Sequence, residues 1–268
     1  MKKYISLFVL TIVLVSCNVQ ERIVFNNDMG GTYESTFDLG QMMQMVGQSG
    51  AASTEELPVK MDTLINFNDM MVQYKDSIAT LSPDKQAQLQ QLKGMTMHMQ
   101  MDQETGVYSI AANKKFSQFS DIEFVSYQMD EVFNMAKQQG AQEQQAAGPG
   151  GDMLKTDKVR YTFKDNVFRR VDEKTFEKEN QTEGEATEIE NEDSTGEDMM
   201  KGMLAQFDDM LAQSKMTLVY TFPKKIKSVS NDMAEISEDG KTVMFEVDWK
   251  TLLDDKTILD TFEVVLED

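Results

Sequence analysis

Residues 95–101 read MTMHMQM, and this short stretch is the clearest indication of the fold. Polar residues alternate in it with four methionines, which are Met95, Met97, Met99 and Met101. Because successive side chains of a β-strand point to opposite faces, the pattern predicts a strand with one face made of methionine. A turn over 102–106 and an apolar stretch over 107–112 predict the second strand of a hairpin.

The same alternation recurs on both sides of this hairpin. Further strands are predicted at 22–27, 32–39, 158–164, 167–171, 216–222, 227–236, 242–249 and 261–266, with turns such as Asp165-Asn166 and Asp239-Gly240 between neighbours. Apolar residues at helical spacing predict amphipathic helices over 40–46, 59–78, 82–92, 127–137 and 199–211. The predicted fold class is therefore α+β, with a curved antiparallel sheet of hairpins and amphipathic helices packed on one side.

Segments of biased composition divide the chain. Residues 172–198 are rich in Glu and Asp and poor in large apolar residues, so they predict a disordered acidic linker. Calcium binding is an alternative there, but the acids lack the spacing of an EF-hand loop. The predicted organisation is a signal peptide at 1–16, an α+β region at 17–171, this linker, and a C-terminal region at 199–268 that completes the same domain. Residues 47–58 and 138–152 are predicted to be shorter linkers.

The N-terminal residues indicate where the protein resides. Lys2 and Lys3 precede an apolar run over 5–15, which is too short to span a bilayer comfortably. The run ends in Leu-Val-Ser-Cys17, which resembles the lipobox of bacterial lipoproteins. The resemblance implies cleavage before Cys17 and attachment of acyl chains such as palmitate to it. An ordinary secretory signal with an incidental cysteine is the alternative.

This resemblance implies a protein of the cell envelope that contacts the membrane through lipidated Cys17. Asn18 follows the cysteine and is compatible with sorting to an outer membrane, on its periplasmic or surface-facing side. Cys17 is the only cysteine, so the sequence excludes a disulfide, a thiol nucleophile and a cysteine zinc site. The net charge of −20 opposes nucleic-acid binding, because phosphate contacts need clustered Lys and Arg.

Catalytic motifs are missing from the sequence. His98 is the only histidine, and no G-x-S-x-G, H-E-x-x-H or Gly-rich phosphate loop accompanies it. We therefore predict no catalytic residue, no metal site and no cofactor. A hydrolase built on paired carboxylates is an unfavoured alternative, because most acids fall in linkers or on solvated faces.

A resemblance to a family appears near the C-terminus. Residues 218–231 read LVYTFPKKIKSVSN and residues 240–249 read GKTVMFEVDW, which together resemble secreted lipoproteins of the LppM kind. The resemblance implies a membrane-anchored α+β domain that binds lipids or other apolar ligands. It assigns no site residues, and the long helical insert and the acidic segment depart from the pattern.

The chain contains 22 methionines, and three interpretations compete for them. Methionine is flexible and polarizable and suits adaptable apolar sites, so Met95, Met97, Met99 and Met101 are candidate ligand-binding residues. Binding of Cu(I) by these thioethers and His98 is a second interpretation, although a strand places His98 on the opposite face. Ordinary use of methionine in the core is the third. The favoured function is a non-catalytic binding module for an apolar ligand or a partner protein. The alternative is a structural or assembly lipoprotein that docks onto an envelope protein through Met-rich helices.

Overall fold

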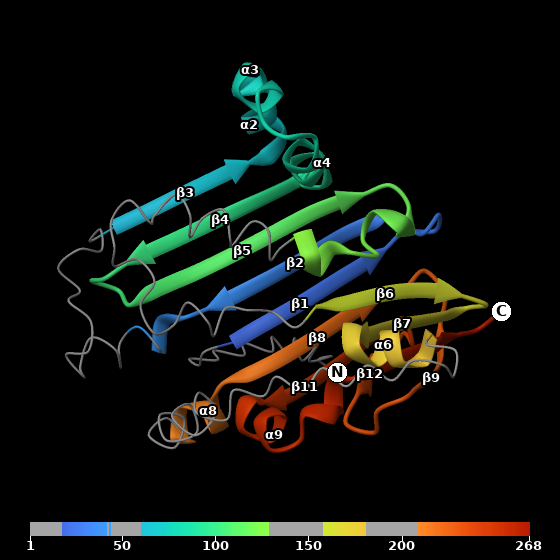
Figure 1. Cartoon of the computed structure of the whole chain (residues 1–268). Helices are drawn as coiled ribbons and strands as arrows, with labels where there is room; N and C mark the ends of the chain where they lie inside the picture. The colour runs from blue at the N-terminus through green and yellow to red at the C-terminus, as the bar shows by residue number, and fades with distance from the viewer. Residues whose placement is uncertain (1–17, 42, 44–59, 129–157, 181–207) are drawn as a thin grey trace, which may run out of the picture.

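The structure, a computed structural model, describes residues 18–41, 43, 60–128, 158–180 and 208–268. It confirms the predicted α+β fold class: antiparallel strands form two sheets, and several short helices accompany them (Figure 1). The signal peptide, Cys17, the linkers 47–58 and 138–152, and most of the predicted helices 40–46, 127–137 and 199–211 lie outside the described residues.

The larger sheet contains eight strands. Their order across the sheet is β10 (Glu235–Ile236), β11 (Thr242–Asp248), β8 (Lys215–Thr221), β1 (Asn18–Phe25), β2 (Gly31–Asp38), β5 (Val107–Phe116), β4 (Met95–Asp102) and β3 (Lys60–Asn66). All neighbours are antiparallel except β1 and β8, which run parallel with Val19 opposite Met216. Strands from the two ends of the chain thus lie side by side in the middle of one sheet.

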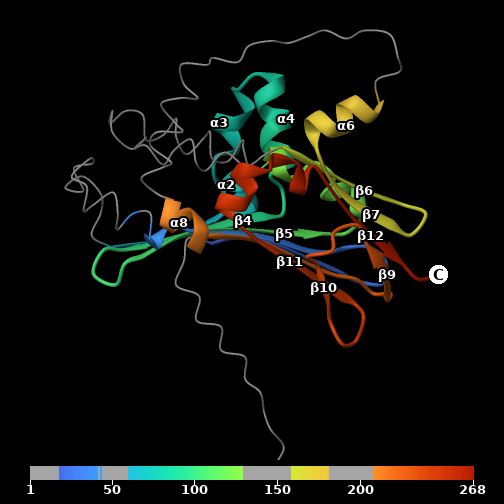
Figure 2. The ribbon, with the colours of Figure 1, turned by 90° about the horizontal axis from the view of Figure 1, so that it is seen from below.

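The smaller sheet has the order β6 (Val159–Lys164), β7 (Val167–Asp172), β12 (Thr261–Leu266) and β9 (Ile226–Val229). It packs against one end of the larger sheet (Figure 2). Aromatic residues fill the interface between the two sheets. Phe168 of β7 lies with its ring centroid 5.0 Å from that of Tyr220 and 5.5 Å from that of Phe222, both from the other sheet or its end. Such ring pairs add to the burial of apolar area that stabilises the packing. A second sheet was not predicted, because alternation identifies strands but not their partners.

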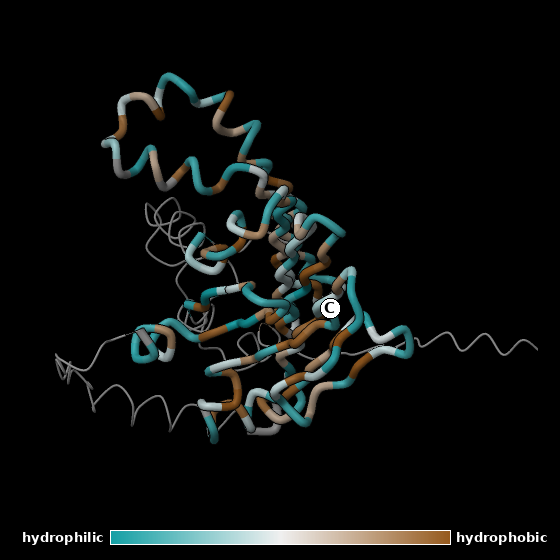
Figure 3. The backbone as a smooth tube through the Cα atoms, turned by 90° about the vertical axis from the view of Figure 1, so that its right-hand side faces the viewer, coloured by the Kyte–Doolittle hydropathy of each residue, from teal (hydrophilic) through white to brown (hydrophobic). Residues whose placement is uncertain are grey.

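The helices lie on the same side of the larger sheet as the smaller sheet (Figure 2). They are α2 (Phe67–Gln73), α3 (Lys75–Ala79), α4 (Pro83–Gln91), α6 (Glu173–Asn180), α8 (Asp208–Gln213) and α9 (Trp249–Asp254), with 3-10 turns at Phe119–Asp121 and Lys256–Leu259. We call the covered face of the larger sheet the inner face and the opposite face the outer face. Apolar and polar positions alternate along the strands accordingly (Figure 3).

A second, smaller core lies on the inner face next to α2 and α4. Buried Met95 and Met97 of β4 pack there with Phe67 of α2, Leu89 of α4 and Leu92. Ser82 caps α4 by accepting a hydrogen bond from the Lys85 N–H, as predicted for a Ser-Pro helix start.

The helix predicted over 59–78 is wrong in its first part. Residues 60–66 form β3, paired with β4, and the chain becomes helical only at α2. Met61 and Ile65 fit both periods, because they share one face of this strand with Thr63 and also lie four residues apart. Pairing with the methionine strand decides between the two structures. The Asn66 side chain accepts a hydrogen bond from the Asn68 N–H at 3.0 Å and starts α2.

The acidic segment also differs from its prediction. Residues 173–180 form α6 instead of a disordered linker, and residues 181–198 lie outside the described residues. Asp172 begins this helix by accepting a hydrogen bond from the Lys174 N–H at 2.9 Å. Arg160 of β6 contacts α6, because its guanidinium lies 4.1 Å from the ring centroid of Phe176. Tertiary contacts thus order a segment whose composition alone favours disorder.

Candidate functional site

The registers of the larger sheet arrange inner-face side chains in rows that cross the strands. One row contains Tyr220, Ile23, Tyr33, Lys114 and Met95. The next contains Leu218, Glu21, Ser35, Ala112 and Met97, and the one after it contains Met216, Val19, Phe37, Ile110 and Met99. From the first row to the third, the inner face therefore leads from the aromatic core toward the start of β1.

Polar residues occupy the first two of these rows. Together with two polar residues that face them from the smaller sheet, we call them the polar belt. The belt comprises Glu21, Tyr33, Ser35, Lys114 and Tyr220 from the larger sheet, together with Tyr161 and Arg170 from β6 and β7 of the smaller one. All seven are buried. Buried polar groups need partners, so each contact in the belt has consequences for stability.

Glu21 is the centre of the belt. Its Oε1 accepts a hydrogen bond from the Tyr220 hydroxyl at 2.5 Å, and its Oε2 lies 3.7 Å from Nε of Arg170. Arg170 also donates a hydrogen bond to the Leu259 carbonyl oxygen at 3.3 Å. Burial and the negative charge of Glu21 raise the pKa of Tyr33, Tyr161 and Tyr220 above the ordinary value. The tyrosines therefore stay protonated, and Arg170 balances the charge of Glu21.

Lys114 is the other buried cation of the polar belt. It is 5% exposed and stands between Tyr33 and Met95 across the strands. Its Nζ donates hydrogen bonds to the Gln91 carbonyl oxygen at 3.3 Å and to the side-chain oxygen of Gln128. Burial lowers the pKa of Lys114, and the negative charge of Asp121 opposes this change. Unlike Arg170, Lys114 is held by amide oxygens.

The structure brings the four predicted methionines to one face of β4, as the alternation requires. Met95 and Met97 are 1% and 3% exposed and belong to the small core under α2 and α4. Met99 and Met101 are half-buried, opposite half-buried Ile110 and Tyr108 of β5. We call the half-buried set of Met99, Met101, Tyr108 and Ile110 the methionine end. Two of the candidate residues are thus core residues, and two lie where the covering is thinner.

His98 lies on the outer face, away from the methionines. Its Nε2 is 2.6 Å from Oδ1 of Asp62 on β3, and this hydrogen bond lowers the pKa of the Asp62 carboxyl. A copper site made from His98 and the methionines would require both faces of one strand to converge, which the geometry of β4 does not provide. Within the described residues, no group of three or more His, Cys, Asp or Glu side chains is arranged to hold a metal ion.

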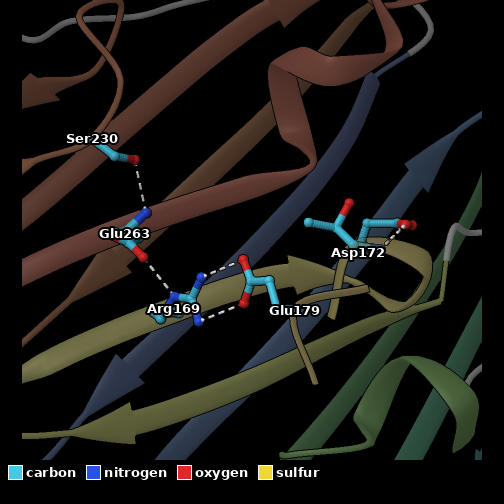
Figure 4. A network of polar contacts seen from close by, with 6 residues as sticks. Arg169, Asp172, Glu179, Ser230 and Glu263 are labelled. Carbon is cyan, nitrogen blue, oxygen red and sulfur yellow. Dashed lines mark hydrogen bonds and ion pairs between the residues drawn. The ribbon is translucent and has the colours of Figure 1, made fainter. Parts of the chain in front are cut away.

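A second polar network holds α6 onto the smaller sheet (Figure 4). Arg169 of β7 donates to both carboxylate oxygens of Glu179 at 3.1 and 3.0 Å, and its Nε donates to Glu263 of β12 at 2.5 Å. The backbone N–H of Glu263 donates to the Ser230 hydroxyl at 2.9 Å. These side chains are partly exposed and join secondary-structure elements, so the network is structural.

The polar belt was not predicted from the sequence, although charged residues at inward strand positions indicate it. Glu21 precedes Ile23 and Phe25 at the same phase of β1, and Lys114 falls between Ala112 and Phe116 on the inner phase of β5. A charged residue at an inward position of an alternating strand is unusual, because ionised side chains are seldom fully buried without a partner. The buried charged residues can therefore be recognised in the sequence, but the residues that contact them come from other elements and cannot.

Comparisons by sequence and by structure give different results for this chain. No family model matches the chain, and no curated protein matches it. Its structure is similar to the NMR structure of the folded domain of LppM from Mycobacterium tuberculosis, at 8% sequence identity and a TM-score of 0.33, over 94% of this chain and 91% of that one. Residues 218–231 and 240–249 resemble the same type of lipoprotein in sequence. A TM-score this low does not establish a common fold or a common site.

No helix among the described residues has the length and apolar character needed to cross a membrane. The lipid anchor predicted at Cys17 lies outside the described residues. Asn18, the next residue, is the first residue of β1 and is paired with Lys215 of β8.

Proposed function

We propose that this protein is a lipid-anchored, non-catalytic binding module of the cell envelope, which holds an apolar ligand at the methionine end. The observation that supports this function best is the course of β4. Its methionine face begins inside the small core at Met95 and Met97 and continues into half-buried Met99 and Met101. Side chains with flexible thioethers at the border of a core can repack around ligands of different shape.

The position of the predicted anchor supports the same function. Val19 lies in the same row as Ile110 and Met99, and Cys17 comes two residues before Val19. The methionine end therefore lies at the same end of the inner face as Val19, the second residue of β1. An apolar ligand taken from the membrane would meet these residues first.

The proposal is tested by native mass spectrometry of residues 17–268 with Cys17→Ser, after incubation with vesicles made from total lipids of the host envelope. We expect an added mass that disappears on denaturation. Met99→Gln with Met101→Gln should reduce the adduct strongly, because the side chains become polar on the inner face. His98→Gln, on the outer face of the same strand, is the matched control and should keep it. A bare mass in all three proteins would refute ligand binding.

Partner docking is the second candidate, because apolar side chains are exposed at one corner of the molecule. Leu64 of β3 is 69% exposed, Val72 of α2 is 78% exposed, and Tyr74 is 52% exposed. Large apolar side chains gathered on a surface mark interaction sites more often than isolated ones do. In vivo crosslinking from position 72 to an envelope protein, lost with Leu64→Ser, would favour this candidate over ligand binding.

A further inference from the structure

We infer that the ligand of the methionine end is a long-chain carboxylate whose headgroup pairs with Lys114. This inference rests on the proposed function and adds the chemical class of the ligand. It follows from the charge of Lys114, from its place on the inner face, and from the side chains between it and the methionine end.

Lys114 is a buried cation held by amide oxygens rather than by a carboxylate. An ammonium has three N–H bonds, and the described residues supply two acceptors, the Gln91 carbonyl and the Gln128 side chain. Asp121 acts on Lys114 only through its charge, because its own oxygens accept from the Ser117 and Gln118 N–H groups at 3.0 and 3.2 Å. A buried charge is costly unless it is paired, so an anion that reached Lys114 would be bound favourably.

Arg170 of β7, the other cation of the polar belt, provides the comparison. Both cations are buried, at 5% exposure for Lys114 and 6% for Arg170. Arg170 has a carboxylate of this chain, Glu21, at 3.7 Å. Lys114 has no recorded ion pair with an acid of the described residues. The larger sheet thus supplies a counter-ion for one buried cation and leaves the other to amide oxygens.

The inner face connects Lys114 to the methionine end along β5. Lys114, Ala112 and Ile110 are successive inner-face positions of this strand, and Ile110 belongs to the methionine end. Four residues of strand span on the order of 13 Å, which is a distance that an acyl chain can cover. Ala112 stands between Ser35 and Met97, so the middle of this path has two small side chains and one flexible side chain.

A carboxylate suits this site better than a phospholipid headgroup. Lys114 is 5% exposed and enclosed by α4 and Gln128, so a group that reaches it must displace buried side chains, and a carboxylate displaces fewer of them than a glycerophosphate. The ligand would then lie with its carboxylate at Lys114 and its apolar chain toward the methionine end and the membrane.

The test compares palmitate with methyl palmitate as competitors of a neutral apolar fluorescent dye bound to residues 17–268 with Cys17→Ser. We expect palmitate to bind at least about tenfold more tightly than its ester, the size of one charge-assisted hydrogen bond. Lys114→Met should weaken palmitate to the level of the ester and leave the ester and the dye unchanged. Lys115→Met is the matched control, because Lys115 is exposed on the outer face and should have no effect.

A second variant keeps the test decisive if Lys114→Met fails to fold. Gln128→Glu places a carboxylate beside Lys114, so it should weaken palmitate and leave methyl palmitate unchanged. Equal affinity of the wild-type protein for acid and ester, or tighter binding of dioleoyl phosphatidic acid than of palmitate, would overturn the carboxylate inference and leave the binding module intact. Failure of the dye and of every lipid to bind would instead refute the proposed function.

Discussion

At the scale of residues, ion pairs of this protein differ by their surroundings. Glu21 and Arg170 are 5% and 6% exposed, whereas the side chain of Lys60, which pairs with Asp102 at 3.1 Å, is 76% exposed. An exposed pair gains little, because water and salt screen both charges. Removing one partner of a buried pair leaves an uncompensated charge in a medium of low polarity.

Arg170→Met should therefore destabilise the protein by about 3–5 kcal/mol. The physical cause is the unpaired Glu21 carboxylate, so Glu21→Leu combined with Arg170→Met should recover most of the loss. Urea unfolding followed by circular dichroism measures the effect, with Lys60→Met as the control that changes little. A loss below about 1 kcal/mol for Arg170→Met would show that Glu21 is not held by this pair.

The lowered pKa of buried Lys114 and the raised pKa values of the buried tyrosines predict opposite dependences of the protein's stability on pH. Burial lowers the pKa of Lys114 below its ordinary value of 10.5, so between these two values the unfolded chain binds more protons than the folded one. Stability should then rise with pH in that window. The raised pKa of Tyr161 and Tyr220 has the reverse effect, but only above their ordinary value of 10.0.

Urea unfolding from about pH 8 to about pH 9.5 separates these effects, since the tyrosines do not yet titrate there. We expect the wild-type protein to gain stability relative to Lys114→Met across this range. Lys115→Met should follow the wild-type curve. Parallel curves for wild type and Lys114→Met would mean that burial does not lower the pKa of Lys114 into this pH range.

At the scale of elements, α6 depends on contacts more than on its own sequence. Arg160 lies between two rings, with its guanidinium 4.7 Å from the ring centroid of Phe124 and 4.1 Å from that of Phe176. Arg169 binds Glu179 near the other end of the helix. An isolated helix of this length is marginal in water, so these contacts account for its presence.

Phe176→Ala should release α6 while leaving both sheets intact. Hydrogen exchange read by mass spectrometry should show loss of protection over residues 173–180 and little change over β6 and β7. Phe176→Leu keeps an apolar side chain and should show a smaller loss. Unchanged protection of residues 173–180 in Phe176→Ala would assign the stability of α6 to its polar contacts, which include Arg169 with Glu179 and Arg160 with Glu173.

Several elements follow from local pattern, and others do not. The hairpin β6–β7 was predictable, and its Asp165 and Asn166 have φ of 52° and 61°, the left-handed turn that such residues favour. Residues 60–66 were predicted as a helix because Met61, Leu64 and Ile65 fit a helical stripe. Only pairing with β4 makes them a strand, and that contact is invisible to a short window of sequence.

At the scale of the whole molecule, the strands were mostly predictable and their assembly was not. The pairing of β1 with β8 joins residues about two hundred positions apart in the chain. The division into two sheets depends on β12 joining β7 and β9, and alternation is equally compatible with one continuous sheet. The polar belt combines residues from six strands, so its charged residues can be recognised in the sequence but their contacts with one another cannot.

The predicted lipid anchor is tested on the whole chain. Cys17→Ser should move the protein from the membrane fraction to the soluble fraction of lysed cells, because the acyl chains on Cys17 are the predicted membrane attachment. Metabolic labelling with an alkyne analogue of palmitate should mark the wild-type protein and not the variant. Ser16→Ala, one residue earlier, is the control and should stay labelled. Equal labelling of the wild type and Cys17→Ser would exclude Cys17 as the acylated residue.

The central position of β1 has a mechanical consequence. This strand is paired from Asn18 to Val24 with β8 on one side and from Val19 to Phe25 with β2 on the other. A tension applied at residue 17 along the strand loads both ladders in shear, so their hydrogen bonds resist together instead of opening one after another. A lipid anchor at this point would transmit force from the membrane along β1, in the direction in which both ladders resist it together. The same force applied to edge strand β3 would load a single ladder, the one with β4.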